Sequence, residues 1–206
     1  MPMNVEISKL DMAALDRILI GTKNGAVPVL VRALNKTLTS VKSQAAKEVA
    51  ADLNVTQARI KKNFVKSHSA SWKNPTAGFV AQGKPLGLVD FIGTRQVKKG
   101  MSVKIKKSGT RDIIKHAFKS ILWAGKEDVG QRIYEGVRKP ARGTYPYTAY
   151  RALPFKYRWP VKRLTGPRIE DELGKPSVIG AVMAHASERL DVILEQELNY
   201  ELSKLK

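Results

Sequence analysis

The chain of 206 residues contains no cysteine, and its 18 acidic residues are far outnumbered by 37 lysines and arginines. Without cysteine, disulfide bonds, thiolate nucleophiles and thiolate metal sites are excluded. No apolar run approaches the roughly 20 residues that cross a bilayer. The first residues include Glu6 and Asp11, where an export signal would be basic. We therefore expect a soluble protein that is made in the cytoplasm and does not contact a membrane.

The residue patterns of catalytic and metal sites are also missing. His68, His116 and His185 are scattered, and the i, i+4 spacing of Asp112 and His116 more often stabilises a helix than binds a metal. The sequence has no G-x-S-x-G, H-E-x-x-H or G-x-x-x-x-G-K-[ST] motif. The adjacent carboxylates of residues 170–172 are typical of a helix start. We expect no catalysis, no metal and no cofactor.

The positive charge is concentrated in the middle of the chain. Residues 23–168 contain 31 basic and seven acidic side chains, whereas residues 169–206 contain four basic and eight acidic ones. A basic body can bind a polyanion, and it can equally contact the acidic end of a neighbouring copy. The sequence leaves both interpretations open. The acidic contact would be made by the carboxylates of the last helix, Glu188, Asp191, Glu195 and Glu197.

The spacing of apolar residues predicts an α+β fold with long N-terminal helices, a central mostly antiparallel sheet and a long C-terminal helix. A first helix is expected over residues 8–20. The best-marked helix begins near Pro28, and Asn54 is expected in the left-handed conformation after it. Thr56 then caps a short basic helix. The stripe of the long helix consists of Leu30, Leu34, Leu38, Val41, Ala45 and Val49.

Further elements are expected in the second half of the chain. Residues 77–81 and 86–92 are strand candidates, and residues 101–106 alternate as a strand with one solvent-exposed face. Residues 111–122 are predicted to form a helix with one apolar face. The last helix is expected to begin at Ser177.

Two segments are rich in cationic side chains. Rings in the second segment could stack on single-stranded bases, but protein interfaces are also enriched in Tyr, Trp and Arg, and the irregular ring spacing favours an interface. The first segment contributes Arg95, Lys98, Lys99, Lys104, Lys106 and Lys107. The second contributes Arg138, Arg142, Arg151, Arg158, Lys162 and Arg163, with the aromatic residues Tyr145, Tyr147, Tyr150, Phe155, Tyr157 and Trp159.

A DNA-binding helix-turn-helix over residues 48–62 is an alternative hypothesis. In that unit Gln57, Arg59 and Lys61 would face the major groove. The long first helix argues against it, because it exceeds what such a unit needs.

The order of these features resembles the minor tail protein Z family of long-tailed bacteriophages, also described as tail completion proteins. The resemblance is carried by the segments ALNKTLTSVKSQAAKEVAADLNV, GLVDFIGTRQVKKGMSVK and WPVKRLTGPRI, and it extends from about residue 28 to 200. The second segment is similar to the family's G-x-R-Q-x-[KR]-[KR]-G-x-[ST]-V turn. The chain departs from the pattern between Glu135 and Phe155, which is longer and richer in Tyr, and at Thr165, where an aromatic residue is expected.

The resemblance implies a structural virion protein of the phage tail or neck, assembled in the host cytoplasm and needed at the head-proximal end of the tail for head–tail joining. Its implied partners are other copies in a ring and the tail terminator, tail tube or head-connector proteins. Non-specific contact with genomic DNA stays open. No catalytic residues are implied. We expect residues 1–25 to form a helical extension and residues 26–206 one α+β domain, with an aromatic and basic insertion at 125–159.

Overall fold

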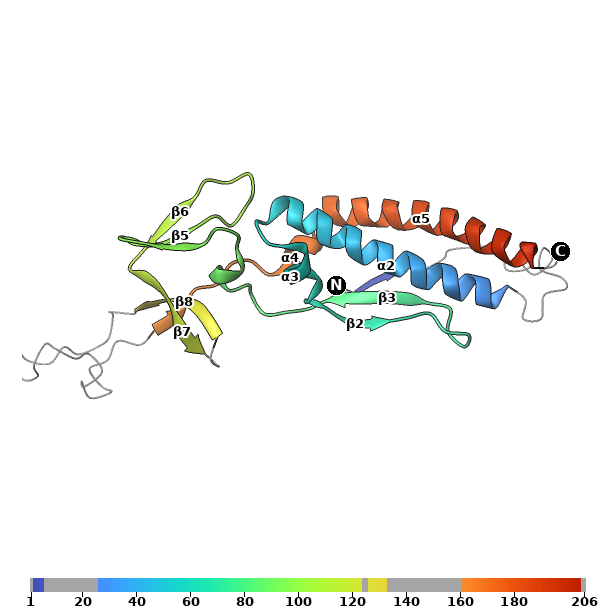
Figure 1. The fold of residues 1–206 in the computed structure, drawn as a ribbon, viewed down its shortest axis with the longest axis horizontal. Helices are drawn as coiled ribbons and strands as arrows, with labels where there is room; N and C mark the ends of the chain where they lie inside the picture. Colours follow the sequence, from blue (N-terminus) through green and yellow to red (C-terminus); the bar gives the residue numbers. More distant parts are fainter. Residues whose placement is uncertain (1, 6–25, 124–125, 133–160, 205–206) are drawn as a thin grey trace, which may run out of the picture. The chain divides into compact units, whose positions relative to one another are not determined.

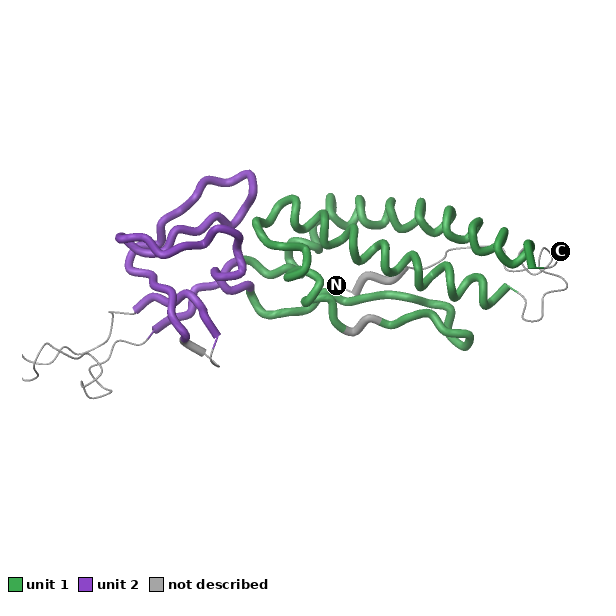
Figure 2. Tube along the Cα trace, in the orientation of Figure 1, with its two compact units in different colours: residues 1–85, 167–206 green, residues 86–166 purple. Residues whose placement is uncertain are grey.

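The computed structural model describes residues 2–5, 26–123, 126–132 and 161–204 (Figure 1). The chain divides into two compact units, the first comprising residues 1–85 and 167–206 and the second residues 86–166 (Figure 2). Helices and antiparallel strands are both present, and the C-terminal helix is long, as the sequence predicts. The expected helix over 8–20 and most of the expected insertion at 125–159 lie outside the described residues.

Two long helices form the centre of the first unit. Helix α2 (Val27–Asp52) and helix α5 (Pro176–Ser203) each carry a proline in the first turn, where the missing N–H costs no hydrogen bond. They run antiparallel, because Arg32 near the start of α2 contacts Glu197 near the end of α5. The predicted stripe of α2 is confirmed, since Leu30, Leu34 and the other members are buried.

A three-stranded sheet covers α2 on the side away from α5 (Figure 1). It consists of β1 (Pro2–Val5), β3 (Ala77–Ala81) and β2 (Phe64–His68), in that order and antiparallel. The predicted strand over 77–81 is confirmed with the same bounds. Its buried Phe79 ring lies 4.8 Å from the ring of Phe64, so the core of this unit extends from α5 through α2 to the sheet.

The connections at the ends of the helices agree only in part with the predictions from the sequence. Thr56 caps the short helix α3 (Gln57–Lys61) by accepting a hydrogen bond from the backbone N–H of Arg59, as expected. The prediction of a left-handed conformation at Asn54 is wrong, because His116 is the only non-glycine residue with positive φ among the described residues. The chain instead leaves α2 through an extended Leu53, whose side chain is buried in the core like that of Val55.

Helix α4 (Ile169–Leu173) precedes α5 in the first unit, and carboxylates fill its first turn as predicted. No helix in the described part of the chain is both long and apolar enough to cross a membrane.

The second unit contains two antiparallel three-stranded sheets. One has the order β4 (Arg95–Val97), β5 (Gly100–Val103) and β6 (Asp112–Lys115). The other has the order β7 (Ala117–Trp123), β8 (Lys126–Arg132) and β9 (Val161–Arg163). The core of this unit includes Leu86, Phe91, Met101 and Val129, all buried.

Three expectations for the second unit are wrong. The predicted helix over 111–122 is two strands, β6 and β7, separated at His116 with φ 61°. The predicted strand over 86–92 is a 3-10 turn, η1 (Leu88–Asp90), preceded by an isolated bridge from Gly87 to Thr165. The strand predicted over 101–106 ends at Val103, and its Ser102, on the same face as the exposed Arg95 and Ile113, is only 3% exposed beside these larger side chains.

The expected single central sheet is also wrong, because the described strands form three separate sheets. Most of these strands have only three to five residues. In the second unit a left-handed residue, His116, separates the last strand of one sheet from the first strand of the next.

Candidate functional site

The segment with the family-like turn folds as a tight hairpin. Val97 pairs with Gly100, so Lys98 and Lys99 are the two residues of the turn between β4 and β5. Gly100 has φ 150°, and a Cβ there would lie 2.0 Å from the carbonyl oxygen of Ile114. Only glycine therefore allows β6 to pair at this position.

Two other residues of the segment have structural roles. The Gln96 amide donates to the carbonyl oxygens of Gly100 and Ala117 at 3.1 and 3.3 Å, and its oxygen accepts from the backbone N–H of Lys119 at 3.0 Å. This side chain thus links the two sheets of the second unit. Gly93 has φ 75°, and its carbonyl oxygen accepts a hydrogen bond of 2.7 Å from Arg111.

Three cations of the segment, Arg95, Lys98 and Lys99, are exposed, whereas Lys104 is half-buried. Residues directly opposite in an antiparallel sheet share a face, so Arg95, Ser102 and Ile113 lie on one face, together with Val97, Gly100 and Lys115. Lys98 and Lys99 lie in the turn that ends this face. We call Arg95, Lys98, Lys99 and Lys115 the cationic sheet; all four side chains are exposed.

The other predicted cations of this segment lie at the opposite end of the same sheet. Lys104, Lys106 and Lys107 belong to the connection between β5 and β6, whereas the turn with Lys98 and Lys99 is at the other end of β5. The structure therefore divides the predicted basic surface into two groups. Sequence reasoning missed Lys115, because it assigned this residue to a helix.

Few carboxylates accompany these cations. Asp112 is exposed at the far end of β6, opposite Val103. Glu127 pairs with Lys119 at 2.6 Å, and Asp128 pairs with Arg163. Within the described residues, no member of the cationic sheet forms a salt bridge.

Arg163 holds strand β9 on strand β8. It pairs with Asp128, which is 5% exposed and also accepts a 2.9 Å hydrogen bond from the backbone N–H of Val129. Gly87 leaves room for this pair, because a Cβ there would lie 3.0 Å from Asp128 Oδ1. Lys162 is exposed. All six predicted aromatic residues lie outside the described residues. The same holds for the other predicted cations of this group, Arg138, Arg142, Arg151 and Arg158.

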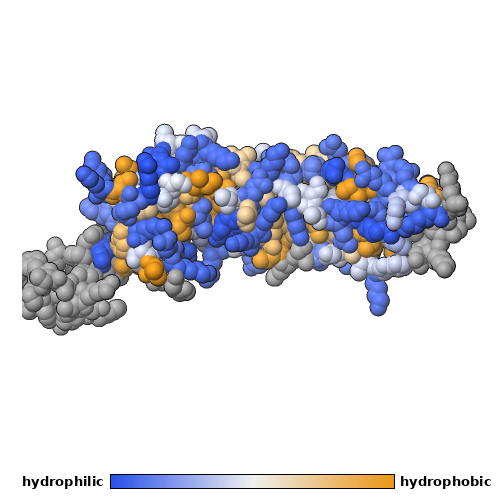
Figure 3. Space-filling model, in the orientation of Figure 1, coloured by the Kyte–Doolittle hydropathy of each residue, from blue (hydrophilic) through white to orange (hydrophobic). Residues whose placement is uncertain are grey.

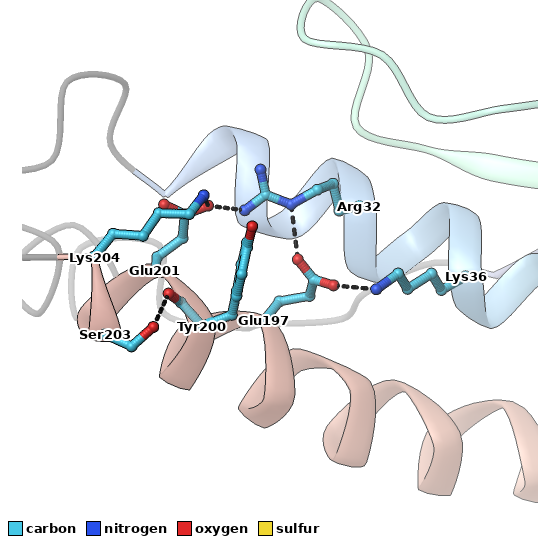
Figure 4. A network of polar contacts seen from close by, with 7 residues as sticks. All are labelled: Arg32, Lys36, Glu197, Tyr200, Glu201, Ser203 and Lys204. Carbon is cyan, nitrogen blue, oxygen red and sulfur yellow. Dashed lines mark hydrogen bonds and ion pairs between the residues drawn. The ribbon is translucent and has the colours of Figure 1, made fainter.

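The predicted acidic residues of the last helix have two different environments. Glu188, Asp191 and Glu195 recur at spacings of three and four and are exposed on the outer face of α5, beside Val192, which is 39% exposed. Glu197 faces α2 instead and is 5% exposed. It accepts hydrogen bonds from Arg32 Nε at 2.7 Å and Lys36 Nζ at 2.5 Å (Figure 4).

The pKa of Glu197 reflects this network of hydrogen bonds. Burial opposes the charge of Glu197, but the hydrogen bonds from Lys36 and Arg32 outweigh burial and hold its pKa below the usual value. Arg32 also pairs with Glu201 (Figure 4). The sequence contains a signal for this cluster, because Arg32 and Lys36, like Glu197 and Glu201, are four residues apart on helices.

Polar contacts continue along the two helices. Ser40 Oγ lies 3.0 Å from His185 Nε2. At the other end, Lys175 contacts Asp52 at 2.5 Å and also Glu172, and these hydrogen bonds raise the pKa of Lys175. The contacts fix one register of α2 against α5.

A second exposed feature of the first unit is a turn that presents Trp72. Ser71 and Asn74 exchange backbone hydrogen bonds of 2.9 and 3.1 Å, and Trp72 between them is 58% exposed. The Asn35 side chain holds this loop on α2 through hydrogen bonds of 2.8 and 3.1 Å to the backbone of Ala70. Tryptophan is enriched among the residues that dominate protein contacts.

The geometry of residues 48–62 does not suit a helix-turn-helix. Helix α3 has five residues, so it is about 7.5 Å long, and strand β2 begins at Phe64. Arg59 donates a 2.6 Å hydrogen bond to Asn63 within the same chain. Gln57 and Lys61 are exposed on little more than one turn, which is short for a helix that reads base edges in the major groove.

The described residues contain no group of three or more His, Asp or Glu side chains that could hold a metal ion. Hydrophilic side chains dominate the face drawn in Figure 3, where apolar atoms occur in small separate groups. No family model, curated protein or solved structure matches the chain.

Proposed function

We propose that the protein is a structural subunit of a phage tail or neck. It acts as a tail completion protein at the head-proximal end of the tail, where it is needed for head–tail joining. It assembles with other copies in a ring and with tail terminator, tail tube or head-connector proteins, and it performs no catalysis. Its place of action is the virion.

The observation that carries this proposal is the structure of residues 93–103. This segment is the most specific part of the resemblance to minor tail protein Z, and its residues divide clearly by role. Gly93, Gln96 and Gly100 hold the hairpin, whereas Arg95, Lys98 and Lys99 are exposed. A motif in which fixed residues present exposed cations is suited to contact with an anionic partner in the assembly, protein or nucleic acid.

Two further surfaces of the first unit support assembly. The outer face of α5 combines Glu188, Asp191 and Glu195 with the partly exposed Val192, and the fixed turn presents Trp72. Two different patches that fit each other generate a head-to-tail contact, which closes into a ring when the rotation permits.

Electron microscopy of particles that lack the protein tests the proposal. We expect filled heads and complete-length tails that remain separate, and joining restored when the protein is supplied from a plasmid. Normal joined particles without the protein would contradict the proposal. A mass measurement on the purified protein adds a second test, because a dimer that binds one DNA operator would instead support a regulator.

A further inference from the structure

We propose that the cationic sheet of the second unit binds the phosphate backbone of nucleic acid without reading the base sequence. This inference goes beyond the proposed assembly function, because it assigns a ligand to Arg95, Lys98, Lys99 and Lys115. It does not depend on ring formation or head–tail joining.

The first argument is the spacing of the charges. The four cations lie on one face of a sheet and on the turn that ends it. Arg95 pairs with Ser102 and Lys115 with Gly100, so these two cations lie about two residues, or roughly 7 Å, apart along the strand direction, and the turn follows directly. Duplex DNA carries one negative charge per ~1.7 Å of its axis, so cations grouped over this distance can contact more than one phosphate.

The second argument is that the charges are held in place by the backbone. The hairpin is fixed by Gly100 and by the three hydrogen bonds of Gln96. The backbone N–H of His116 donates to the carbonyl oxygen of Lys99 at 3.1 Å, which ties the turn to the end of β6 beside Lys115. The backbone that carries these cations therefore does not need to be ordered when the ligand binds.

The third argument distinguishes a phosphate backbone from an acidic protein. Lysine is depleted from protein interfaces, which depend on aromatic and apolar anchors. Three of the four cations are lysines, and Ile113 is the only large apolar residue strongly exposed on the described part of this face. Compact ammonium charges with little apolar surface are suited to phosphate.

The fourth argument concerns sequence readout. Adenine is read by Asn or Gln amides and guanine by bidentate Arg or Lys. The amide of Gln96 is used inside the unit, and Gln131 donates to the carbonyl oxygen of Lys115 at 3.0 Å. The described face therefore offers no amide that could read adenine, which leaves its four cations for phosphate contacts.

The test compares two variants of the full-length protein with the same change in net charge. One is Arg95→Gln/Lys98→Gln/Lys99→Gln/Lys115→Gln. The matched control is Lys47→Gln/Lys62→Gln/Lys73→Gln/Lys84→Gln, four lysines that are also exposed but lie in the first unit. Binding to a fluorescent DNA duplex of random sequence is followed by anisotropy between about 50 and 200 mM salt, and circular dichroism verifies that both variants fold.

For the wild type we expect affinity that falls steeply with salt. Each lost phosphate contact makes the slope of log K against log salt shallower by about 0.9, so the cationic-sheet variant should lose up to about 3.6 from the slope. The control should keep nearly the wild-type slope. Duplexes of different sequence should bind the wild type equally.

Three outcomes would overturn the inference. Unchanged DNA binding by the cationic-sheet variant would show that the face does not contact phosphates. Equal losses in both variants would show that overall charge, and not this face, determines binding. Loss of self-association with DNA binding intact would assign the face to acidic residues of a second copy. In all three cases the assembly proposal is still tested separately by the particles that lack the protein.

Discussion

Glu197 illustrates how one side chain can determine the pairing of two long helices. Its carboxylate is almost fully buried, and each oxygen accepts a hydrogen bond from a different cation of α2, Arg32 or Lys36. A register that separated this carboxylate from both cations while it stayed buried would be costly. The same residue that could have served as an acidic surface contact is therefore committed to the interior.

Replacing Glu197 by Gln should destabilise the protein by about 1–3 kcal/mol, because the two cations lose their shared counter-charge. The measurement is urea unfolding at neutral pH. Glu195→Gln is the matched control on the exposed face of the same helix and should stay within about 0.5 kcal/mol of the wild type. Equal effects of the two substitutions would show that the network contributes no stability.

The same carboxylate predicts a dependence on pH. Its pKa is lowered in the folded protein, because the hydrogen bonds from Lys36 and Arg32 outweigh burial. The stabilisation is therefore fully present above the pKa of the unfolded chain and is lost as the pH falls through the lower folded value. The difference in unfolding free energy between the wild type and Glu197→Gln should shrink as the pH falls below the ordinary pKa of glutamate, about 4.3. A difference that stays constant over this range would contradict the assignment.

At the scale of elements, the long helix and strand β3 were predictable, and most of the other short strands were not. The stripe from Leu30 to Val49 repeats over many turns, so its period is unambiguous. In residues 111–122, Ile113, Ile114 and Phe118 fit a helical face and a strand almost equally. In the structure the segment forms two strands that are separated by a left-handed His116. The sequence gives no signal for this conformation.

The candidate surfaces were also only partly predictable from the sequence. The cations from Arg95 to Lys107 are local in sequence and were found, but their division between the two ends of a sheet depends on strand pairing. The roles of Arg163 and Glu197 depend on partners far away in the chain, Asp128 and Arg32. The periodicity of a sequence indicates which face of an element is apolar. It does not indicate which distant charged side chain pairs with a buried charged side chain.

Gly100→Ala should disrupt the β4–β5–β6 sheet. A methyl group there would meet the carbonyl oxygen of Ile114 at 2.0 Å, on a backbone with φ 150°, and the backbone strain alone costs about 1–3 kcal/mol. Gly109→Ala is the control in the same unit, where the nearest atom would be 3.5 Å away. Urea unfolding should show a large loss for the first variant and little change for the second. A similar stability of both would mean that β6 does not approach Gly100 this closely.

At the scale of the whole molecule, the two units have separate apolar cores. The first is built on α2, α5 and strand β3, with Leu34, Val41 and Phe79 buried. The second is built on short strands around Met101 and Val129. The network at Glu197 belongs to the first unit and the cationic sheet to the second, so a substitution in one should leave the other intact.

Hydrogen exchange followed by mass spectrometry tests this division. Local opening depends on the contacts of each cooperative region, so Glu197→Gln should speed exchange in α2 and α5 while peptides that cover β4 and β5 exchange as in the wild type. Gly100→Ala should show the reverse pattern, with faster exchange in β5 and β6 and unchanged protection in the two long helices. If either substitution accelerated exchange throughout the described elements, the two units would form a single cooperative region, and the separate assignment of their surfaces would no longer hold.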